Sequence, residues 1–309
     1  GSATNFSNHA YKMGPMHYGT LERGSKTASG AYILMPAHIG EFSVCFGKLM
    51  YHPDTRSLPF SYLIAYNDVM YLVPGRNLTT VGLYRDIRKW PKRDKRPAGA
   101  RKSVVNFDWP FTVGEILRGK KILEDLREAS GEDVSTYNYH EYVIKNSSLR
   151  KGIKYYDIAL RIYMGAVLKR HAPVEPTTTV GTGPWTDISG LLLPVSEEQR
   201  IIDDIISGEI ETTHDLIERF EEINANYSEY RWAWSYRMIL DYYGFTSLTE
   251  ENVERVKSDY ITARRAWIAE IKKDAAKEYR LGDVEEEVFR NFNDQLDKEV
   301  DFENQKLYM

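Results

Sequence analysis

The sequence predicts a mixed β and α protein. Its N-terminal part is expected to form a short left-handed parallel β-helix-like region with a hairpin, followed by an α-helical bundle. The segment Ile39-Gly40-Glu41-Phe42-Ser43-Val44 places an aliphatic residue, a glycine and a small residue as one flat face of such a β-helix requires. Glycines also recur at short intervals through residues 1–60, which suits the corners of stacked coils. Beyond residue 195 the helix signals dominate.

The hairpin and a basic segment complete the predicted β-rich region, residues 1–110. Two runs rich in β-formers, 61–66 and 69–73, flank Asn67-Asp68, which indicates two strands joined by a two-residue turn. Basic side chains crowd residues 85–103, where two prolines disfavour a continuous helix. This segment is therefore predicted as a loop.

The rest of the chain divides into three parts. Residues 111–171 are predicted as a helical extension, which opens at a capping box formed by Thr112 and Glu115. Residues 172–194 are rich in Pro, Thr and Gly without periodicity, so a linker is expected. Residues 195–309 are predicted as an acidic α-helical bundle with short connections.

Composition indicates a soluble globular chain of 309 residues, with 42% hydrophobic and 28% charged residues. No apolar run approaches the roughly 20 residues that span a bilayer, so a membrane partner is not expected. The N-terminal end lacks the layout of a signal peptide, and the single cysteine, Cys45, suits a reducing compartment. A cytoplasmic location follows from these observations.

The net charge of −4 hides an asymmetry between the two halves of the chain. Residues 1–171 carry 26 Lys and Arg against 15 Asp and Glu, and residues 172–309 carry 15 against 30. The acidic half could dock on the basic half of the same or a neighbouring chain, or the basic surface could meet phosphate-bearing ligands. A pI near 6.1 and the absence of a known binding module disfavour nucleic acid.

Several short motifs carry a resemblance to a known family. They are Ser7-Asn8-His9, Lys12-Met13-Gly14-Pro15, Leu21–Thr27, His52-Pro53-Asp54-Thr55, Leu58–Ile64, Lys89–Arg96 and Lys145-Asn146-Ser147-Ser148-Leu149. Through them the chain resembles the C-terminal part of an uncharacterised Bacteroidetes family, a domain of unknown function with left-handed β-helix, hexapeptide-acyltransferase-like segments. The resemblance implies further β-helix coils upstream in a longer chain. It also implies a homo-oligomer, which would be a trimer if the β-helix stacks as in those enzymes.

The same resemblance directs attention to histidines. In hexapeptide acyltransferases a histidine between subunits acts as general base, because imidazole titrates near neutral pH. His9 is the first candidate, with Asn8 as an orienting partner, and His17 is the second. Each could equally be a hydrogen-bonded structural histidine or an exposed one. His38, just before the hexapeptide, is expected at an outer corner.

The basic segment supplies the candidate ligand-binding residues. They are Arg88, Lys89, Trp90, Lys92, Arg93, Lys95 and Arg96. The cations could hold the pyrophosphate of an acyl-CoA or a nucleotide sugar, and the indole could stack on its base. A solvated charged loop, or one that pairs with the acidic residues 197, 198, 203 and 204, is the alternative. No cofactor is assigned.

Other chemistry finds little support in the sequence. No histidine or cysteine spacing indicates a metal site, and Cys45 continues an apolar run, which is typical of a buried thiol. No phosphate-binding glycine loop, nucleophile elbow or kinase signature is present.

Two function classes remain open. The first is a transferase-like enzyme on a phosphorylated or nucleotide-linked sugar, with a histidine base and a basic phosphate pocket. The second is a non-catalytic scaffold, oligomerisation or protein-interaction domain of a larger β-helix protein.

Overall fold

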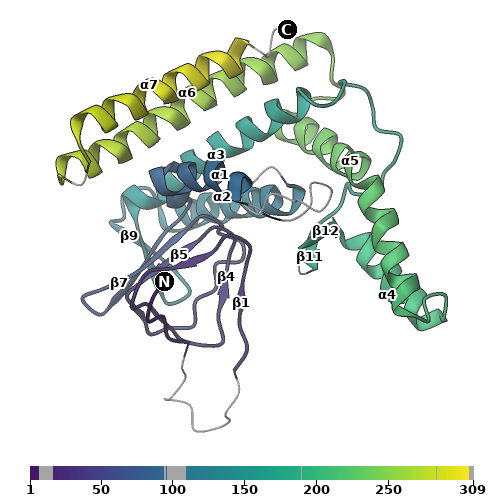
Figure 1. Ribbon diagram of the computed structural model, residues 1–309, viewed down its shortest axis with the longest axis horizontal. Coiled ribbons are helices and arrows are strands. Elements are labelled where there is room, and N and C mark those ends of the chain that lie inside the picture. The colour runs from purple at the N-terminus through teal and green to yellow at the C-terminus, as the bar shows by residue number, and fades with distance from the viewer. Residues whose placement is uncertain (7–16, 94, 96–108, 189, 283, 306–309) are drawn as a thin grey trace. The chain divides into compact units, whose positions relative to one another are not determined.

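The computed structural model describes residues 1–6, 17–93, 95, 109–188, 190–282 and 284–305, and these form a mixed α/β protein (Figure 1). The chain forms two compact units. Unit 1 comprises residues 1–106, 115–160 and 263–309, and unit 2 comprises residues 107–114 and 161–262. The unit boundaries therefore cut across the order of the sequence, and residues from the C-terminal end belong to the same unit as the N-terminal strands.

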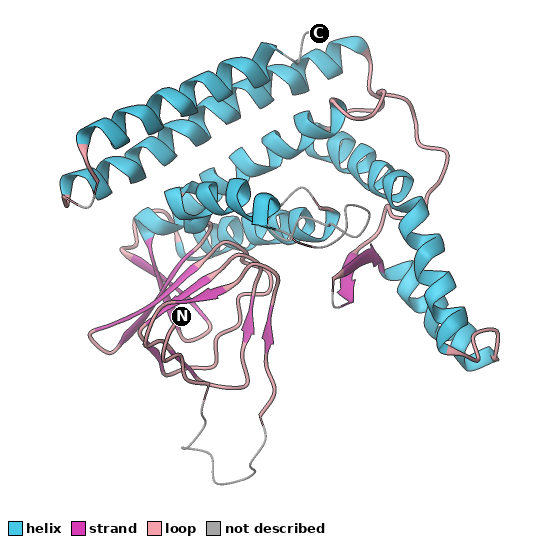
Figure 2. Cartoon of the chain, in the orientation of Figure 1, coloured by secondary structure: helices cyan, strands magenta, loops and turns pink. Residues whose placement is uncertain are grey.

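Unit 1 begins with short strands in small sheets, which Figure 2 draws in magenta. They are β1 (Thr20–Leu21), β2 (Lys26–Thr27), β3 (Tyr32–Ile33), β4 (His38–Ile39), β5 (Val44–Phe46) and β6 (Lys48–Leu49). Parallel pairs join β1 to β4, β2 to β5, and β3 to β6. Residue 20 pairs with 38, 26 with 44, and, between β5 and the later strand at 62–66, 44 with 62, so these partners are 18 positions apart. In the β3–β6 pair residue 32 pairs with 48, an offset of 16.

The predicted hairpin is confirmed. Strands β7 (Tyr62–Tyr66) and β8 (Val69–Val73) pair antiparallel in full register. Asn67 and Asp68 have φ angles of 49° and 60°, the left-handed values that a tight two-residue hairpin turn requires. With β9 (Thr136–Tyr139) and β10 (Tyr142–Lys145) the hairpin belongs to a mixed six-stranded sheet of order β2-β5-β7-β8-β10-β9.

The Ile39-Gly40 pair marks a close approach between successive stretches of chain. Ile39 is fully buried. A Cβ atom on Gly40 would lie 2.1 Å from the carbonyl oxygen of Thr55, a distance that no side chain can occupy. The Thr55 hydroxyl also accepts a hydrogen bond from the Gly40 amide at 2.9 Å. The glycine of this motif is therefore required by packing.

Helices supply the rest of unit 1. They are the short 3₁₀ helix η1 (Arg76–Thr79) and α1 (Val81–Arg93), and parts or all of α2 (Pro110–Ser130), α3 (Asn146–Leu168), α6 (Glu250–Arg280) and α7 (Glu286–Gln305). α6 and α7 run side by side, joined by ring stacking of Tyr279 on Phe289 at 4.7 Å (Figure 1).

The basic segment expected as a loop over 85–103 is helical as far as Arg93. Pro91 lies in the last turn of α1, where loss of one backbone hydrogen bond near the helix end is tolerated better than in its middle. The remainder of that segment, apart from residue 95, lies outside the described residues.

Unit 2 contains the hairpin β11 (Trp185–Ile188) and β12 (Leu191–Pro194), then α4 (Val195–Ser207) and α5 (Thr213–Tyr243). This hairpin occupies the second half of the segment predicted as a linker. One hydrophobic cluster of unit 2 is formed by the buried residues Leu193, Ile201, Ile210 and Ile223. A capping box of Thr212 and Asp215 is present at the start of α5.

Among the described helices, none combines the length and the apolar character needed to cross a membrane.

Candidate ligand-binding site

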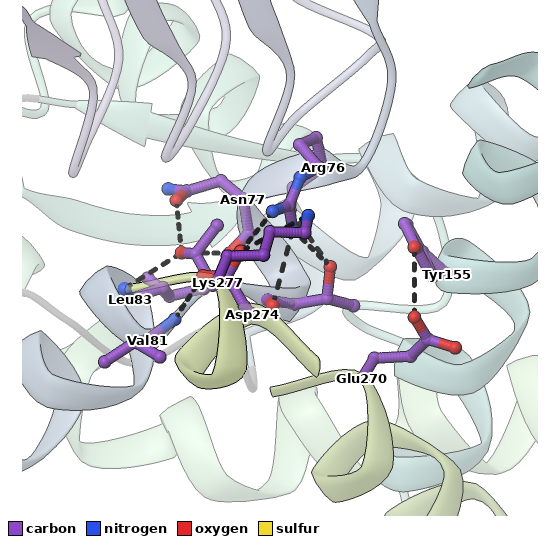
Figure 3. Close-up of polar contacts among 10 residues, drawn as sticks. Arg76, Asn77, Val81, Leu83, Tyr155, Glu270, Asp274 and Lys277 are labelled. Atoms are coloured by element: carbon purple, nitrogen blue, oxygen red, sulfur yellow. Dashed lines mark hydrogen bonds and ion pairs between the residues drawn. The ribbon is translucent and has the colours of Figure 1, made fainter. Parts of the chain in front are cut away.

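The site is built on the first turn of α1, which follows directly from η1. The Thr80 hydroxyl accepts a hydrogen bond from the Leu83 amide at 3.1 Å and donates to the side-chain oxygen of Asn77 at 2.9 Å. A threonine in this position satisfies one of the free amides at a helix start. The chain therefore enters α1 with a fixed direction (Figure 3).

Asp274 of α6 joins this helix start from almost two hundred residues away. One carboxylate oxygen accepts a hydrogen bond from the Val81 amide at 3.0 Å, and the other forms an ion pair with Arg76 (Figure 3). A carboxylate at the N-terminal end of a helix also interacts favourably with the helix dipole. Both side chains are largely buried, with 22% of Arg76 and 15% of Asp274 exposed, so this contact fixes α6 beside α1.

Glu270, one turn earlier on α6, forms a second contact within unit 1. Its carboxylate accepts hydrogen bonds from Lys154 and Lys273 at 2.9 Å. It also accepts one from the Tyr155 hydroxyl at 3.3 Å (Figure 3). Burial by itself would raise the pKa of Glu270, but the two lysines outweigh it and lower the pKa to about 2. The carboxylate thus stays charged and ties α6 to α3.

Aromatic rings close the contact between α1, α6 and α7. The indole of Trp267 donates to the Leu78 carbonyl oxygen at 2.7 Å. The Tyr84 ring lies 6.1 Å from the Trp267 ring and 5.7 Å, edge to face, from the Phe292 ring. Its hydroxyl donates to Glu299 and accepts from Arg88. Burial raises the pKa of Tyr84, with Arg88 opposing the shift, so this side chain remains a neutral donor.

Next to these rings lies a cavity of about 580 Å³, here named the α1–α7 pocket. Its volume is within the range of about 300–1,000 Å³ typical of small-molecule sites. One wall comes from α1 and is cationic, with Arg85, Arg88, Lys89, Lys92 and Arg93. The opposite wall, residue 284 and α7, is mainly apolar, with Val284, Val288, Phe289 and Phe292.

The charge of the pocket is not balanced by its own residues. Arg88 pairs with Glu299. Within the part of the chain that the structure describes, Arg85, Lys89, Lys92 and Arg93 have no acidic partner, and the carboxylate that lines the pocket is that of Glu278. The pocket therefore carries a surplus of positive charge available to an anion.

Four of the predicted ligand-binding residues, Arg88, Lys89, Lys92 and Arg93, thus line one cavity. Helical spacing brings them together, because residues three and four apart share a face. Trp90 lies within α1, but its side chain is outside the described residues, as is Arg96 altogether; Lys95 is exposed and does not line the pocket.

Three of the four acidic residues proposed as alternative partners for this segment are engaged within their own unit. Glu197 pairs with Arg200 at 3.5 Å, and Asp204 pairs with Arg219 at 2.8 Å. Asp203 accepts a hydrogen bond from Gln199 at 2.9 Å. These acidic groups therefore have local partners on α4 and α5.

Of the two predicted histidine bases, the structure describes only the second, His17. His9 and Asn8 lie outside the described residues, and His17 is a partly buried residue just before β1. His17 does not line the α1–α7 pocket.

A different histidine pairs with a carboxylate. His38 Nε2 lies 2.6 Å from Glu22 Oε1, with 25% and 17% of the side chains exposed. Sequence reasoning placed His38 at an outer corner and overlooked Glu22. The offset of 18 positions could have indicated this pair, because it sets residue 20 beside residue 38. Glu22 follows two positions later, where side chains of an extended chain point to the same side again.

A third titratable group belongs to this neighbourhood. Burial raises the pKa of Glu115 of α2, while Ser57, Arg118 and His38 oppose the shift and Glu22 adds to it. Arg118 lies 2.7 Å from the Glu115 carboxylate. The Glu115 carboxylate therefore binds a proton more readily than that of an ordinary glutamate.

Metal and thiol chemistry can be assessed for the described residues. Among these, no group of three or more His, Cys, Asp or Glu side chains is arranged to hold a metal ion. Cys45 is fully buried, and burial raises the pKa of its thiol to about 12. A thiol with that pKa is almost entirely protonated near neutral pH, so Cys45 is a packing residue.

Comparison with known proteins gives two matches, both to domains of unknown function. The family DUF4954 matches residues 1–127, and the family DUF6819 matches residues 168–306, each less than half of the chain. No curated protein and no solved structure matches the chain. The α1–α7 pocket takes its cationic wall from the first matched region and its apolar wall from the second.

Replacing Asp274 tests the contact that fixes α6. We expect Asp274→Ala to lower the free energy of unfolding by about 2–4 kcal/mol, because it removes a helix cap and leaves a largely buried Arg76 unpaired. Chemical denaturation followed by circular dichroism measures this. Asp241→Ala, which breaks an exposed pair with Arg237, is the control and should change stability by less than about 1 kcal/mol. Equal effects of the two changes would contradict the role given to Asp274.

The low pKa of Glu270 predicts an acid-sensitive contribution to stability. Because the pKa is lowered from 4.5 to about 2, the contribution is present above pH 4.5 and is lost as the pH falls towards 2. The lysines are exposed, so solvent screening limits it to on the order of 1–2 kcal/mol. Denaturant unfolding between pH 5 and pH 2 should show a shallower acid loss for Glu270→Gln than for the wild type. If the free energy of unfolding falls equally with pH in the two proteins, Glu270 does not contribute to the acid sensitivity.

Proposed function

We propose that this protein binds a phosphate-bearing organic ligand in the α1–α7 pocket. The observation that carries the proposal is the row of cations on α1, four of which have no acidic partner among the described residues, facing an apolar wall across a cavity of ligand size. Guanidinium and ammonium groups donate short, charge-assisted hydrogen bonds to phosphate oxygens. An anion bound there would replace the missing acidic partners.

The side chains, not the helix backbone, would bind the anion. Arg88, Lys89, Lys92 and Arg93 lie towards the C-terminal end of α1, where the helix dipole favours positive charge. The dipole therefore supports the cations in place but does not itself attract a phosphate. Loss of the side-chain charges should accordingly abolish most of the affinity.

A transferase-like reaction on a phosphorylated or nucleotide-linked sugar is the catalytic extension of this proposal. It needs a general base, for which His9 and His17 are the candidates from the sequence. The Glu22–His38 pair adds a third, because a hydrogen-bonded carboxylate fixes the orientation of an imidazole.

The strand region would serve as the frame of such an enzyme. An offset of 18 positions in the β1–β4, β2–β5 and β5–β7 pairs, and of 16 in the β3–β6 pair, supports stacked coils of short strands, as in a left-handed parallel β-helix.

The test is ligand binding to a pocket variant and a matched control. In Lys92→Ala/Arg93→Ala, two exposed cations of the pocket are removed; in Arg150→Ala/Lys151→Ala, two exposed cations of α3 are removed. Calorimetry with coenzyme A, a nucleotide sugar and a sugar phosphate should show the affinity of at least one ligand lowered 10- to 100-fold in the pocket variant alone. This range corresponds to charge-assisted hydrogen bonds worth about 1.5–3 kcal/mol. Failure of all three ligands, and of inorganic phosphate and octyl phosphate, to bind the wild type would refute the proposal.

A non-catalytic scaffold or oligomerisation domain is the second candidate, and α4 favours it. Ile202, Ile205 and Ile206 are 43%, 49% and 78% exposed, which forms an apolar stripe on the surface of unit 2. Clustered exposed apolar side chains mark interaction surfaces more often than single ones do. We propose a second copy of this chain as the partner, since its basic half complements the acidic residues beside the stripe.

Sedimentation measures this second candidate directly. The wild type should sediment as an oligomer at micromolar concentration, and Ile205→Asp/Ile206→Asp should shift it to the monomer. Leu281→Asp, at a residue 77% exposed outside α4, should leave the oligomer unchanged. A wild type that is already monomeric, or a shift caused equally by Leu281→Asp, counts against the interface.

A further inference from the structure

The α1–α7 pocket restricts the part of the ligand that does not carry the phosphate, and this inference rests on the function proposed above. Opposite the cations stand Val284, Val288, Phe289 and Phe292. Two of these are aliphatic, and none has a hydrogen-bonding side chain. Val288 is 56% exposed although it is a large apolar residue, so covering it with an apolar group would remove that surface from water.

Polar side chains are scarce away from α1. Among the described lining residues outside α1, only Glu278 and Gln295 have side chains that can hydrogen-bond. A sugar has several hydroxyl groups, and each one buried without a partner costs free energy. A hexose bound against this wall would therefore leave most of its hydroxyl groups facing hydrocarbon, which counts against the sugar substrate of the catalytic extension.

The aromatic rings of the wall are already engaged with protein. Phe289 stacks on Tyr279 at 4.7 Å with an angle of 9° between the rings. Phe292 meets the Tyr84 ring edge to face at 5.7 Å. The wall thus presents ring surfaces held rigidly by neighbours together with two valines, a surface that suits hydrocarbon contact.

We propose that the ligand is an amphipathic phosphate ester, with its phosphate on the α1 cations and a hydrocarbon tail on the α7 wall. Such a molecule satisfies both walls at once, because each half meets the chemistry it requires. A free phosphate, or a phosphate ester with a polar body, would use only the α1 wall.

Calorimetry with three probes tests the proposal: inorganic phosphate, glucose 1-phosphate and octyl phosphate. Each buried methylene group should increase affinity about fourfold, so octyl phosphate should bind at least tenfold more tightly than glucose 1-phosphate. Binding of all three with equal affinity would overturn the amphipathic ligand and leave the phosphate pocket standing. Binding of none would overturn both.

A substitution in the apolar wall separates the tail from the phosphate. Val288→Asn should weaken octyl phosphate at least fivefold and leave inorganic phosphate unchanged. Val174→Asn, at a valine 61% exposed outside the pocket, should change neither. Equal weakening of both probes by Val288→Asn would show a general disturbance of the pocket and overturn the assignment of the wall to a tail.

The two natural sources of such an ester differ in form, and two further probes distinguish them. Geranyl diphosphate is a soluble phosphate ester with its hydrocarbon directly on the phosphate, and vesicles of phosphatidylcholine with phosphatidic acid present a phosphate ester as a lipid. Binding of either one that is weakened by Val288→Asn supports the proposal and identifies the source. Binding of neither, with octyl phosphate also failing to exceed glucose 1-phosphate, overturns it.

Discussion

The contact of Asp274 with Arg76 and the Val81 amide is the constraint on which the candidate site depends. It joins residues 193 positions apart, and it acts at the point where α1 begins. A helix start can be approached by a carboxylate only from a narrow range of directions, because its free amides point along the helix axis. Asp274 therefore sets both the distance and the direction of α6 relative to α1, and α7 follows through its packing on α6.

The α1–α7 pocket forms because the C-terminal segment of the chain packs in the same unit as α1. Strands β1 to β8 and α1 fall within one matched domain of unknown function, and α6 and α7 fall within the other. Residues 263–309 nevertheless belong to unit 1. Neither matched region carries both walls, so a cationic helix and an apolar helix form the α1–α7 pocket only where the two regions meet in this unit.

Part of the site was predictable because it is local in sequence. Arg88, Lys89, Lys92 and Arg93 stand out as a basic cluster, and a phosphate pocket was the hypothesis drawn from them. Their spacing also fits one face of a helix, but the prolines favoured a loop. The apolar wall could not be inferred, since Val288 and Phe292 look like ordinary core residues of a C-terminal helix. The Glu22–His38 pair was missed for a related reason, because strands of two residues carry almost no periodicity.

The sequence by itself determined the features that depend on neighbouring residues. The hairpin turn at Asn67-Asp68 and the capping box of Thr212 and Asp215 are of this kind, because backbone preference and local hydrogen bonds act within a few positions. Only the tertiary structure decided the partner of α1 and the composition of the pocket. Those depend on contacts such as that of Asp274 with Val81, which become favourable only once the intervening chain has folded.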